Sequence, residues 1–295
     1  MTLERRKLKD KIINVWVKSM VVFIILIPVL IAISLVTRSW YVMGHSGLTE
    51  LLFSSVWRPI AGEFGFWPFI ISSVWVSFLG LLFTAPICLL TAIYLTQYKS
   101  KRLLGFMQPV IDIMAGIPSV IYGVWGILVL VPVVRFLGGM LGIETSGFSI
   151  LAGGLVVAVM LIPFILNILI EVFRTVPHDL FEASLSLGAS KWHTIKNVLL
   201  RKTFPGIISA FGLGLSRAFG ETIAVLMVVG NVVQIPNGVF DPGYPLPALI
   251  ANTYGEMLSI PMFDSALMFA ALLLLVVVVV SNILSRLTII HFEKH

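Results

Sequence analysis

Six long apolar runs divide this chain, and they limit its fold more than any other feature. A helix needs about 20 consecutive apolar residues to cross ~30 Å of hydrocarbon, whereas the strands of a membrane barrel show short alternating segments. Backbone groups in lipid must bond within their own segment, so unbroken apolar runs predict helices. The sequence therefore predicts an all-α membrane protein, a polytopic six-helix transmembrane bundle. The expected spans are 15–36, 69–96, 109–134, 150–172, 207–229 and 265–290.

The basic residues predict how these helices are oriented. Only 12% of the residues are charged, and the 20 Lys and Arg outnumber the 14 Asp and Glu, which gives a net charge of +6. Most of the basic residues lie in the N-terminal segment, the 97–108 and 173–204 loops and the C-terminal end. By the positive-inside rule these segments and both termini are cytoplasmic. Since the charge is explained by topology, no nucleic-acid partner is expected, and lipid is the expected surrounding.

Prolines interrupt several spans, and the break at Pro118 is a candidate wall of a translocation pathway. Broken helix is tolerated in a membrane where it is buried or lines a wet cavity. The segment "AGIPSVIYG" places Ser119 and Tyr122 beside that proline. Packing alone is an equally open explanation. The loop 231–264, rich in Pro and Gly, predicts an ordered, irregular external cap.

The 173–204 loop predicts two short amphipathic helices across the inner face of the membrane. Pro177 and Asp179 are typical of a helix start, and Gly188 interrupts the apolar pattern that follows. Apolar residues recur at helical spacing on both sides of that glycine. They are Leu180, Ala183, Leu187, Trp192, Ile195 and Leu199.

The same loop resembles the E-A-A motif of bacterial ABC-importer permeases. Ser184 replaces the second alanine of that motif, and Arg201 stands where the family has a proline. The resemblance implies a coupling helix, at about 178–200, that docks in a cleft of an ATP-hydrolysing subunit. The alternative is an amphipathic helix that contacts only lipid headgroups. The motif residues are Glu182, Ala183, Ser184 and Gly188.

Further stretches narrow the resemblance to the phosphate-specific ABC permeases. They are "TAPICLLTAIYLTQY", "AGIPSVIYGVWG" and "LSRAFGETIAVLMVVGN", while "RPIAGEFGFWPFI" before the second span resembles the PstC subunits more than the PstA subunits. The resemblance implies a type I ABC importer permease fold in a bacterial plasma membrane. It also implies a PstA-like second permease, two ATP-binding subunits and an external phosphate-binding protein as partners. We expect residues 1–68 to form an N-terminal helix and external loop, and residues 69–291 the permease core.

No catalytic, metal or cofactor site is expected within this chain. It lacks a G-x-x-x-x-G-K-[ST] loop, so the ATP and Mg²⁺ that the resemblance implies belong to the partner subunits. "GLGLSRAFG" fails as a dinucleotide motif because Arg217 takes the place of the third glycine and no strand precedes it. Cys88 is the only cysteine, and the five histidines show no metal-ligand spacing.

Arg217 and Glu221 are the candidate substrate residues. If 207–229 is one helix, these side chains are four residues apart and lie on one face. Arginine offers a planar fork of donors to an oxyanion, and Glu221 would weaken that grip so that the anion can leave. The alternative is mutual neutralisation of a structural pair. Ser216 and Thr222 flank the pair and add hydroxyls, whereas Asp112 is expected to cap the start of the third span.

Three other functions remain as alternatives. An importer of the same type could carry sulfate or molybdate instead of phosphate. A stand-alone secondary transporter could use Arg217 and Glu221 as an anion and proton site, but the Glu182–Gly188 motif disfavours it. An intramembrane hydrolase finds no convincing nucleophile and base in this sequence.

Overall fold

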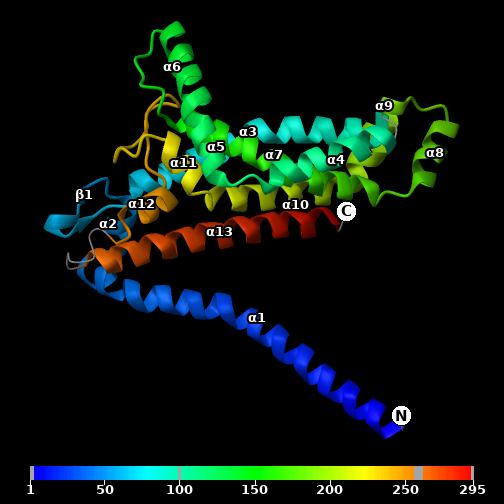
Figure 1. Cartoon of the computed structure of the whole chain (residues 1–295), viewed down its shortest axis with the longest axis horizontal. Coiled ribbons are helices and arrows are strands. Elements are labelled where there is room, and N and C mark those ends of the chain that lie inside the picture. The colour runs from blue at the N-terminus through cyan, green and yellow to red at the C-terminus, as the bar shows by residue number, and fades with distance from the viewer. Residues whose placement is uncertain (1–2, 99–100, 256–261, 294–295) are drawn as a thin grey trace.

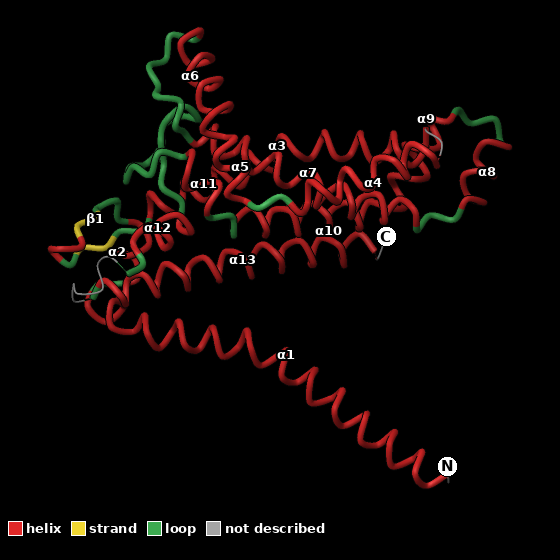
Figure 2. The backbone as a smooth tube through the Cα atoms, viewed as in Figure 1, coloured by secondary structure: helices red, strands yellow, loops and turns green. Residues whose placement is uncertain are grey.

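The computed structural model describes residues 3–98, 101–255 and 262–293, and these are almost entirely helical (Figure 2). The longer helices are α1 (Leu3–His45), α3 (Trp67–Ile93), α4 (Lys101–Gly116), α7 (Ile150–Arg174), α10 (Leu200–Phe219) and α13 (Phe263–Glu293). The shorter ones are α2 (Leu48–Phe53), α5 (Ser119–Trp125), α6 (Val131–Met140), α8 (His178–Ser186), α9 (Lys191–Thr194), α11 (Ile223–Val228) and α12 (Leu246–Thr253). π-Helical turns extend α3 (Tyr94–Tyr98), join α5 to α6 (Gly126–Leu130) and join α9 to α10 (η4, Ile195–Leu199). β1 (Trp57–Arg58) and β2 (Glu63–Phe64) form an antiparallel pair around the 3₁₀ turn Pro59–Ala61.

Six helical segments of the described residues are long and apolar enough to cross a membrane, which confirms the six-helix prediction. Two boundaries were wrong. The third span begins at Ser119 and not near 109, because α4 ends before Pro118. The fifth ends at Phe219 and not near 229, because the helix breaks there. The segments are Lys9–His45, Trp67–Tyr98, Ser119–Met140, Ile150–Arg174, Lys191–Phe219 and Phe263–Thr288.

The long helices α3, α7, α10 and α13 lie side by side and define two ends of the molecule (Figure 1). One end carries α8 and α9, and both termini lie toward it; we call it the α8–α9 end. The opposite end carries α2, the β-hairpin, α6 and α12. Helix α1 packs against α13 at this opposite end and diverges from the bundle toward the N-terminus.

The centre of the bundle is the contact between α3 and α7, where glycines let the two backbones approach. A Cβ added at Gly80 would lie 2.6 Å from a methyl of Val157, and one at Gly154 would lie 2.7 Å from the Cβ of Leu79. The buried Thr84 hydroxyl bonds across the contact to the carbonyl of Ala158 at 2.9 Å. Small residues and such hydrogen bonds hold membrane helices together in place of a hydrophobic driving force.

The segment 231–245 at the opposite end is irregular, as predicted for the cap, whereas Leu246–Thr253 form the helix α12. The buried Ser72 and Ser73 hydroxyls of α3 accept bonds from the backbone of Tyr244 and Leu246, at 3.1 and 2.8 Å. The first backbone N–H of α7, at Ile150, donates to the Asp241 carbonyl at 2.9 Å. The rest of the predicted cap includes 256–261, which lie outside the described residues.

Candidate functional site

The helix break at Pro118 separates α4 from α5, and Tyr122 compensates for it. In an unbroken helix the Met114 carbonyl would accept from the N–H of residue 118, but proline has none. The Tyr122 hydroxyl donates to that carbonyl instead, at 2.8 Å. Pro118 is exposed and Ser119 half-buried, so the predicted wall residues share one broken segment.

A second break follows Arg217, and it overturns the predicted geometry of the charged pair. Helix α10 ends at Phe219, and Gly220 closes it by donating to the Arg217 carbonyl at 3.1 Å. Glu221 lies in the non-helical linker before α11, where its carboxylate accepts from the backbone N–H of Ala224 at 3.3 Å. The two side chains are therefore not on one helix face, and they form no ion pair among those found in the described chain.

Arg217 instead meets aromatic groups of two other helices. Its side chain is exposed, and the guanidinium carbon lies 4.8 Å from the centre of the Phe164 ring on α7. It is also close enough to Tyr122 on α5 for an electrostatic interaction. No carboxylate within the described residues forms an ion pair with it. The arginine fork thus stays available to an anion while its flat face rests on an aromatic ring.

The two flanking hydroxyl residues are engaged elsewhere. Ser216 donates to the Asn282 side chain of α13 at 3.0 Å, so it faces the neighbouring helix. The Thr222 hydroxyl donates to the Gly220 carbonyl at 3.2 Å, within the break itself. The structure therefore places Arg217 against the Phe164 ring, whereas Ser216 and Thr222 bond to other groups.

Glu221 lines a small pocket of about 10 Å³ on the other side of the second break. Two hydroxyl residues of α3, Ser73 and Ser77, line the same pocket, together with Pro245 and Pro247 of the cap. Its carboxylate is half-buried there. Glu221 thus joins α10, α3 and the cap, and its charge lies near the opposite end of the bundle.

A polar cluster between α4 and α7 was missed by the sequence analysis. Gln108 donates to the Asn167 side-chain oxygen at 2.8 Å and to the Asp112 carboxylate at 3.3 Å. Asp112 lies inside α4, which begins at Lys101, so its predicted capping role is wrong. Asn167 follows Phe164 by three residues and shares its side of α7. A polar triplet within an apolar span was the available sequence signal.

The α8–α9 end confirms the prediction of two short helices joined at a glycine. Gly188 has a φ of +81° with open space around an added Cβ, so its backbone conformation and not crowding requires glycine. The Ser184 hydroxyl bonds to Thr194 at 2.9 Å and ties α8 to α9. The serine that departs from the E-A-A pattern therefore fixes the angle between these helices.

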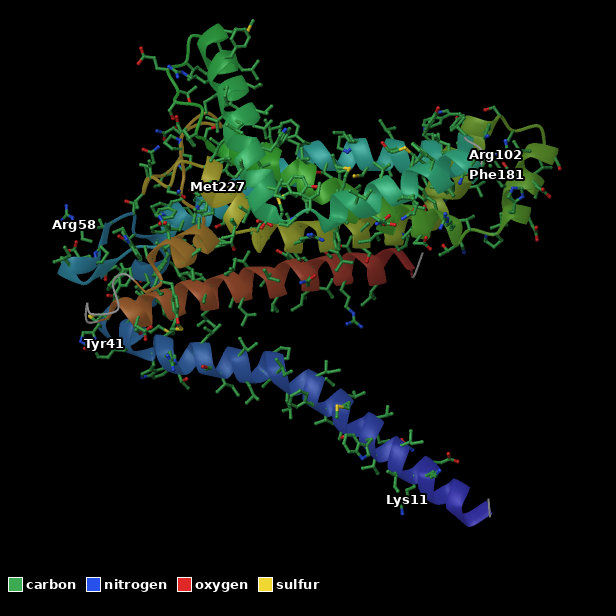
Figure 3. All side chains as sticks on the ribbon, viewed as in Figure 1. Lys11, Tyr41, Arg58, Arg102, Phe181 and Met227 are labelled. Atoms are coloured by element: carbon green, nitrogen blue, oxygen red, sulfur yellow. The ribbon has the colours of Figure 1, made fainter. Side chains whose placement is uncertain are left out.

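The apolar residues of this loop divide into a buried and an exposed set. Ile195 and Leu199 are buried against the bundle, and Phe181 of α8 packs at the edge of the same core (Figure 3). Leu187 is 89% exposed and Trp192 is 53% exposed. The exposed Glu182 carboxylate accepts from His178 Nδ1 at 3.1 Å. Exposed apolar side chains at a polar end of the molecule are typical of a docking surface.

The described residues hold no group of three or more His, Cys, Asp or Glu side chains that could bind a metal ion. Cys88 is buried in α3 and lies 3.5 Å from the Ile162 carbonyl. The site is therefore built from one arginine, aromatic rings, amides and carboxylates.

Comparison with solved structures shows the fold. The chain superposes on the permease of an inward-facing MetNI methionine ABC transporter with a TM-score of 0.58 and 20% identity, over 75% of this chain and 93% of that one. It superposes on a bacterial alginate ABC transporter, solved with an alginate-bound periplasmic protein, with a TM-score of 0.63 and 16% identity, over 96% and 95%. At these identities the likeness establishes a type I ABC importer permease fold and nothing about cargo.

Comparison with known sequences shows the family. The profile described as "Binding-protein-dependent transport system inner membrane component" matches residues 86–289. The phosphate transport system permease protein PstC of Haemophilus influenzae is 34% identical over 94% of this chain and 91% of its own length. The probable ABC transporter permease protein YqgH of Bacillus subtilis is 34% identical over 84% and 81%. The chain therefore belongs to the inner-membrane components of binding-protein-dependent transport systems, within the PstC family of phosphate transport system permeases.

Proposed function

We propose that this chain is the permease subunit of an ATP-driven importer of inorganic phosphate, with Arg217 as the phosphate contact. The single observation that carries the assignment of the contact is the exposed Arg217 guanidinium on the Phe164 ring, with no carboxylate ion pair in the described chain. The PstC relatives, named for phosphate transport, support the choice of cargo. The protein is a transporter subunit of the inner membrane and not an enzyme.

Arginine suits this role because its fork of N–H groups pairs with two oxygens of an oxyanion and stays charged at any cellular pH. Because Arg217 cannot lose its charge, the bound phosphate must be released from it in another way. The half-buried Glu221 supplies a negative charge beyond the break, which repels the bound anion without neutralising Arg217 by direct pairing. Its carboxylate can also accept from the P–OH of hydrogen phosphate. Sulfate carries no such proton near neutral pH, so this contact would favour phosphate over sulfate.

The segment 178–200 is the proposed coupling segment, which docks on an ATP-binding subunit. Its exposed Leu187 and Trp192, and its glycine joint, support a surface that a partner covers. The relatives are named as permeases of transport systems, one of them as an ABC transporter permease, and this supports our assignment of ATP and Mg²⁺ to the partner subunits. A PstA-like second permease, two ATP-binding subunits and an external phosphate-binding protein complete the proposed assembly.

The basic loops favour an orientation in which the α8–α9 end and both termini are cytoplasmic. In this orientation the cap at the opposite end receives the external binding protein. Residues 1–68 then add one helix and an external segment to a core of residues 69–291. The family profile matches residues 86–289, which lie within this proposed core.

The nearest alternative is the same machine with sulfate or molybdate as cargo, because Arg217 recognises any oxyanion of similar shape. A secondary transporter would need neither the coupling segment nor ATP. Both alternatives are tested by the uptake experiment below, which compares phosphate with sulfate and measures dependence on ATP.

The test is uptake of labelled phosphate, with and without ATP and with sulfate as a competitor, by proteoliposomes that contain the co-expressed complex and its binding protein. We expect Arg217→Leu to lose uptake while the complex stays intact. Glu182→Arg should lose uptake together with the ATPase subunit on purification. Arg38→Leu on α1 and Glu50→Arg on α2 make the same substitutions away from both sites and should transport normally. Normal uptake by Arg217→Leu would remove this residue from the path.

A further inference from the structure

A basic groove opens at the α8–α9 end, apart from the Arg217 site. It has a volume of about 1210 Å³ and lies between the end of α7, α8, η4 and the start of α10. Three cationic side chains line it, and all three are exposed. They are Lys196, Arg201 and Lys202.

The groove continues the seam between α7 and α10 that holds Arg217. Gly206, which lines the groove, precedes Arg217 by eleven residues on α10. Thr175, which also lines it, follows Phe164 by eleven residues at the end of α7. Eleven residues are about three helical turns, so each pair shares one helix face at a separation of ~16 Å.

Close packing between the two helices keeps this seam continuous. A Cβ added at Gly206 would lie 2.6 Å from a methyl of Val172, so α10 and α7 are in direct contact at the edge of the groove. The two helices run in opposite directions, since α7 ends and α10 begins at the α8–α9 end. The groove therefore lies at the α8–α9 end of the same face of α10 that carries Arg217.

The charge of the groove is not neutralised within the described chain. None of its three cations forms an ion pair there. Glu171, which lies between Phe164 and Thr175 on α7, is bonded to Arg174 at 2.8 Å, so its charge is compensated. Three exposed cations that form no ion pair within the described residues attract an oxyanion and hold it weakly, which is the balance that conduction requires.

We propose that this groove binds inorganic phosphate as a second station, between Arg217 and the cytoplasm. The proposal rests on the proposed function, because it takes phosphate as the cargo and the α8–α9 end as the inner side. Lys202 lies nearest in sequence to the seam residue Gly206 and receives the anion first, and Lys196 and Arg201 complete the set of donors. A phospholipid headgroup has related chemistry, and the experiment separates the two.

The experiment measures equilibrium binding of labelled inorganic phosphate to the purified complex in nanodiscs of zwitterionic lipid, without binding protein or nucleotide. We expect two binding components in the wild type. The triple variant Lys196→Gln, Arg201→Gln, Lys202→Gln should weaken one of them at least tenfold, because it removes the charged donors of the groove. Arg217→Leu should keep that component and lose the other.

The matched control removes three equal charges from the exposed N-terminal part of α1, as Lys9→Gln, Lys11→Gln, Lys18→Gln, and should bind phosphate as the wild type does. Unchanged binding in the groove variant, with its ATPase subunit retained, would overturn the proposal. So would loss of the groove component in discs that contain an anionic phospholipid, because the headgroup would then be the occupant. Arg217→Leu could transport normally while the groove variant still loses one component of phosphate binding. In that case the groove proposal is supported, and the proposed role of Arg217 in phosphate transport is wrong.

Discussion

The two helix breaks of this protein differ in how they are made and in how the sequence reveals them. At the first, Pro118 removes a backbone donor, and Tyr122 supplies a hydroxyl to the Met114 carbonyl in its place. At the second, Gly220 ends α10 with no proline nearby, and the Glu221 carboxylate caps the short helix that follows. A proline in an apolar span by itself predicts a helix break, because proline lacks the backbone N–H. A glycine is compatible with a continuing helix, so whether the helix ends there depends on the surrounding contacts.

The difference matters because the second break sets the electrostatics of the candidate site. Had the helix continued past Phe219, Arg217 and Glu221 would lie on one face and neutralise each other. Because it breaks, Glu221 faces the small pocket with Ser73 and Ser77, and Arg217 rests on Phe164. Because the helix ends at Phe219, Arg217 forms no ion pair with Glu221 and its guanidinium is available to an anion.

The largest effect is expected where the two breaks touch. Helix α5 packs on α11 at Gly123, where an added Cβ would lie 2.5 Å from the Met227 sulfur and 3.2 Å from the Ala224 backbone. Gly123→Leu should lower the free energy of unfolding by about 3 kcal/mol through overpacking. Thermal unfolding of the purified complex measures it. Gly105→Leu, at a helical glycine with open space, is the control, and equal midpoints for the two variants would contradict this contact.

A double-mutant cycle can test whether the Tyr122 hydroxyl compensates for the backbone N–H that Pro118 lacks. Tyr122→Phe leaves the Met114 carbonyl without its hydroxyl donor and should cost about 1.5 kcal/mol of stability. Pro118→Ala restores a backbone N–H that can serve that carbonyl. We expect the double variant to lose less stability than the sum of the two single variants. Additive losses would show that the hydroxyl does not compensate for the proline.

The capping role of Glu221 predicts a smaller effect that separates structure from transport. Glu221→Leu should lose about 1 kcal/mol, because the Ala224 N–H loses its acceptor, whereas Glu221→Gln keeps an oxygen there. Glu221→Gln should nevertheless reduce the preference for phosphate over sulfate, measured as competition in the uptake assay. If uptake and selectivity of Glu221→Gln match the wild type, Glu221 serves only as a cap.

The smallest effect is expected at Ser216, beside the second break. Its hydroxyl bonds to Asn282 of α13, and hydrogen bonds between membrane helices contribute about 0.6 kcal/mol on average. Ser216→Ala should lower the unfolding midpoint slightly and leave the Michaelis constant for phosphate uptake unchanged. A raised constant without a stability change would place this hydroxyl in the path.

Much of the architecture could be predicted because it depends on local patterns. Long apolar runs predicted the six spans, and Gly188 predicted the joint between α8 and α9, which its positive φ explains. The predictions failed where a residue type fits more than one conformation. The residues after Phe219 are compatible with a helix, and Asp112 is compatible with a cap, so their environments decided the outcome.

The candidate site shows the same division. Arg217 and Glu221 stood out because charge within an apolar span is costly and marks function. Their separation, the ring of Phe164 and the amides of Gln108 and Asn167 could not be inferred, since they depend on contacts between α4, α5, α7 and α10.

The sequence by itself determined that this is a membrane protein, the number of its spans, the glycine joint between α8 and α9 and its family, because hydropathy, glycine conformation and motif spacing act over a few neighbouring residues. Only the tertiary structure decided where α10 ends and that Arg217 and Glu221 form no ion pair with each other. It also decided that a basic groove lies at the end of the contact between α7 and α10 where Arg217 is found. Those features arise where helices distant in sequence meet, and there packing and hydrogen bonds between helices outweigh local propensity.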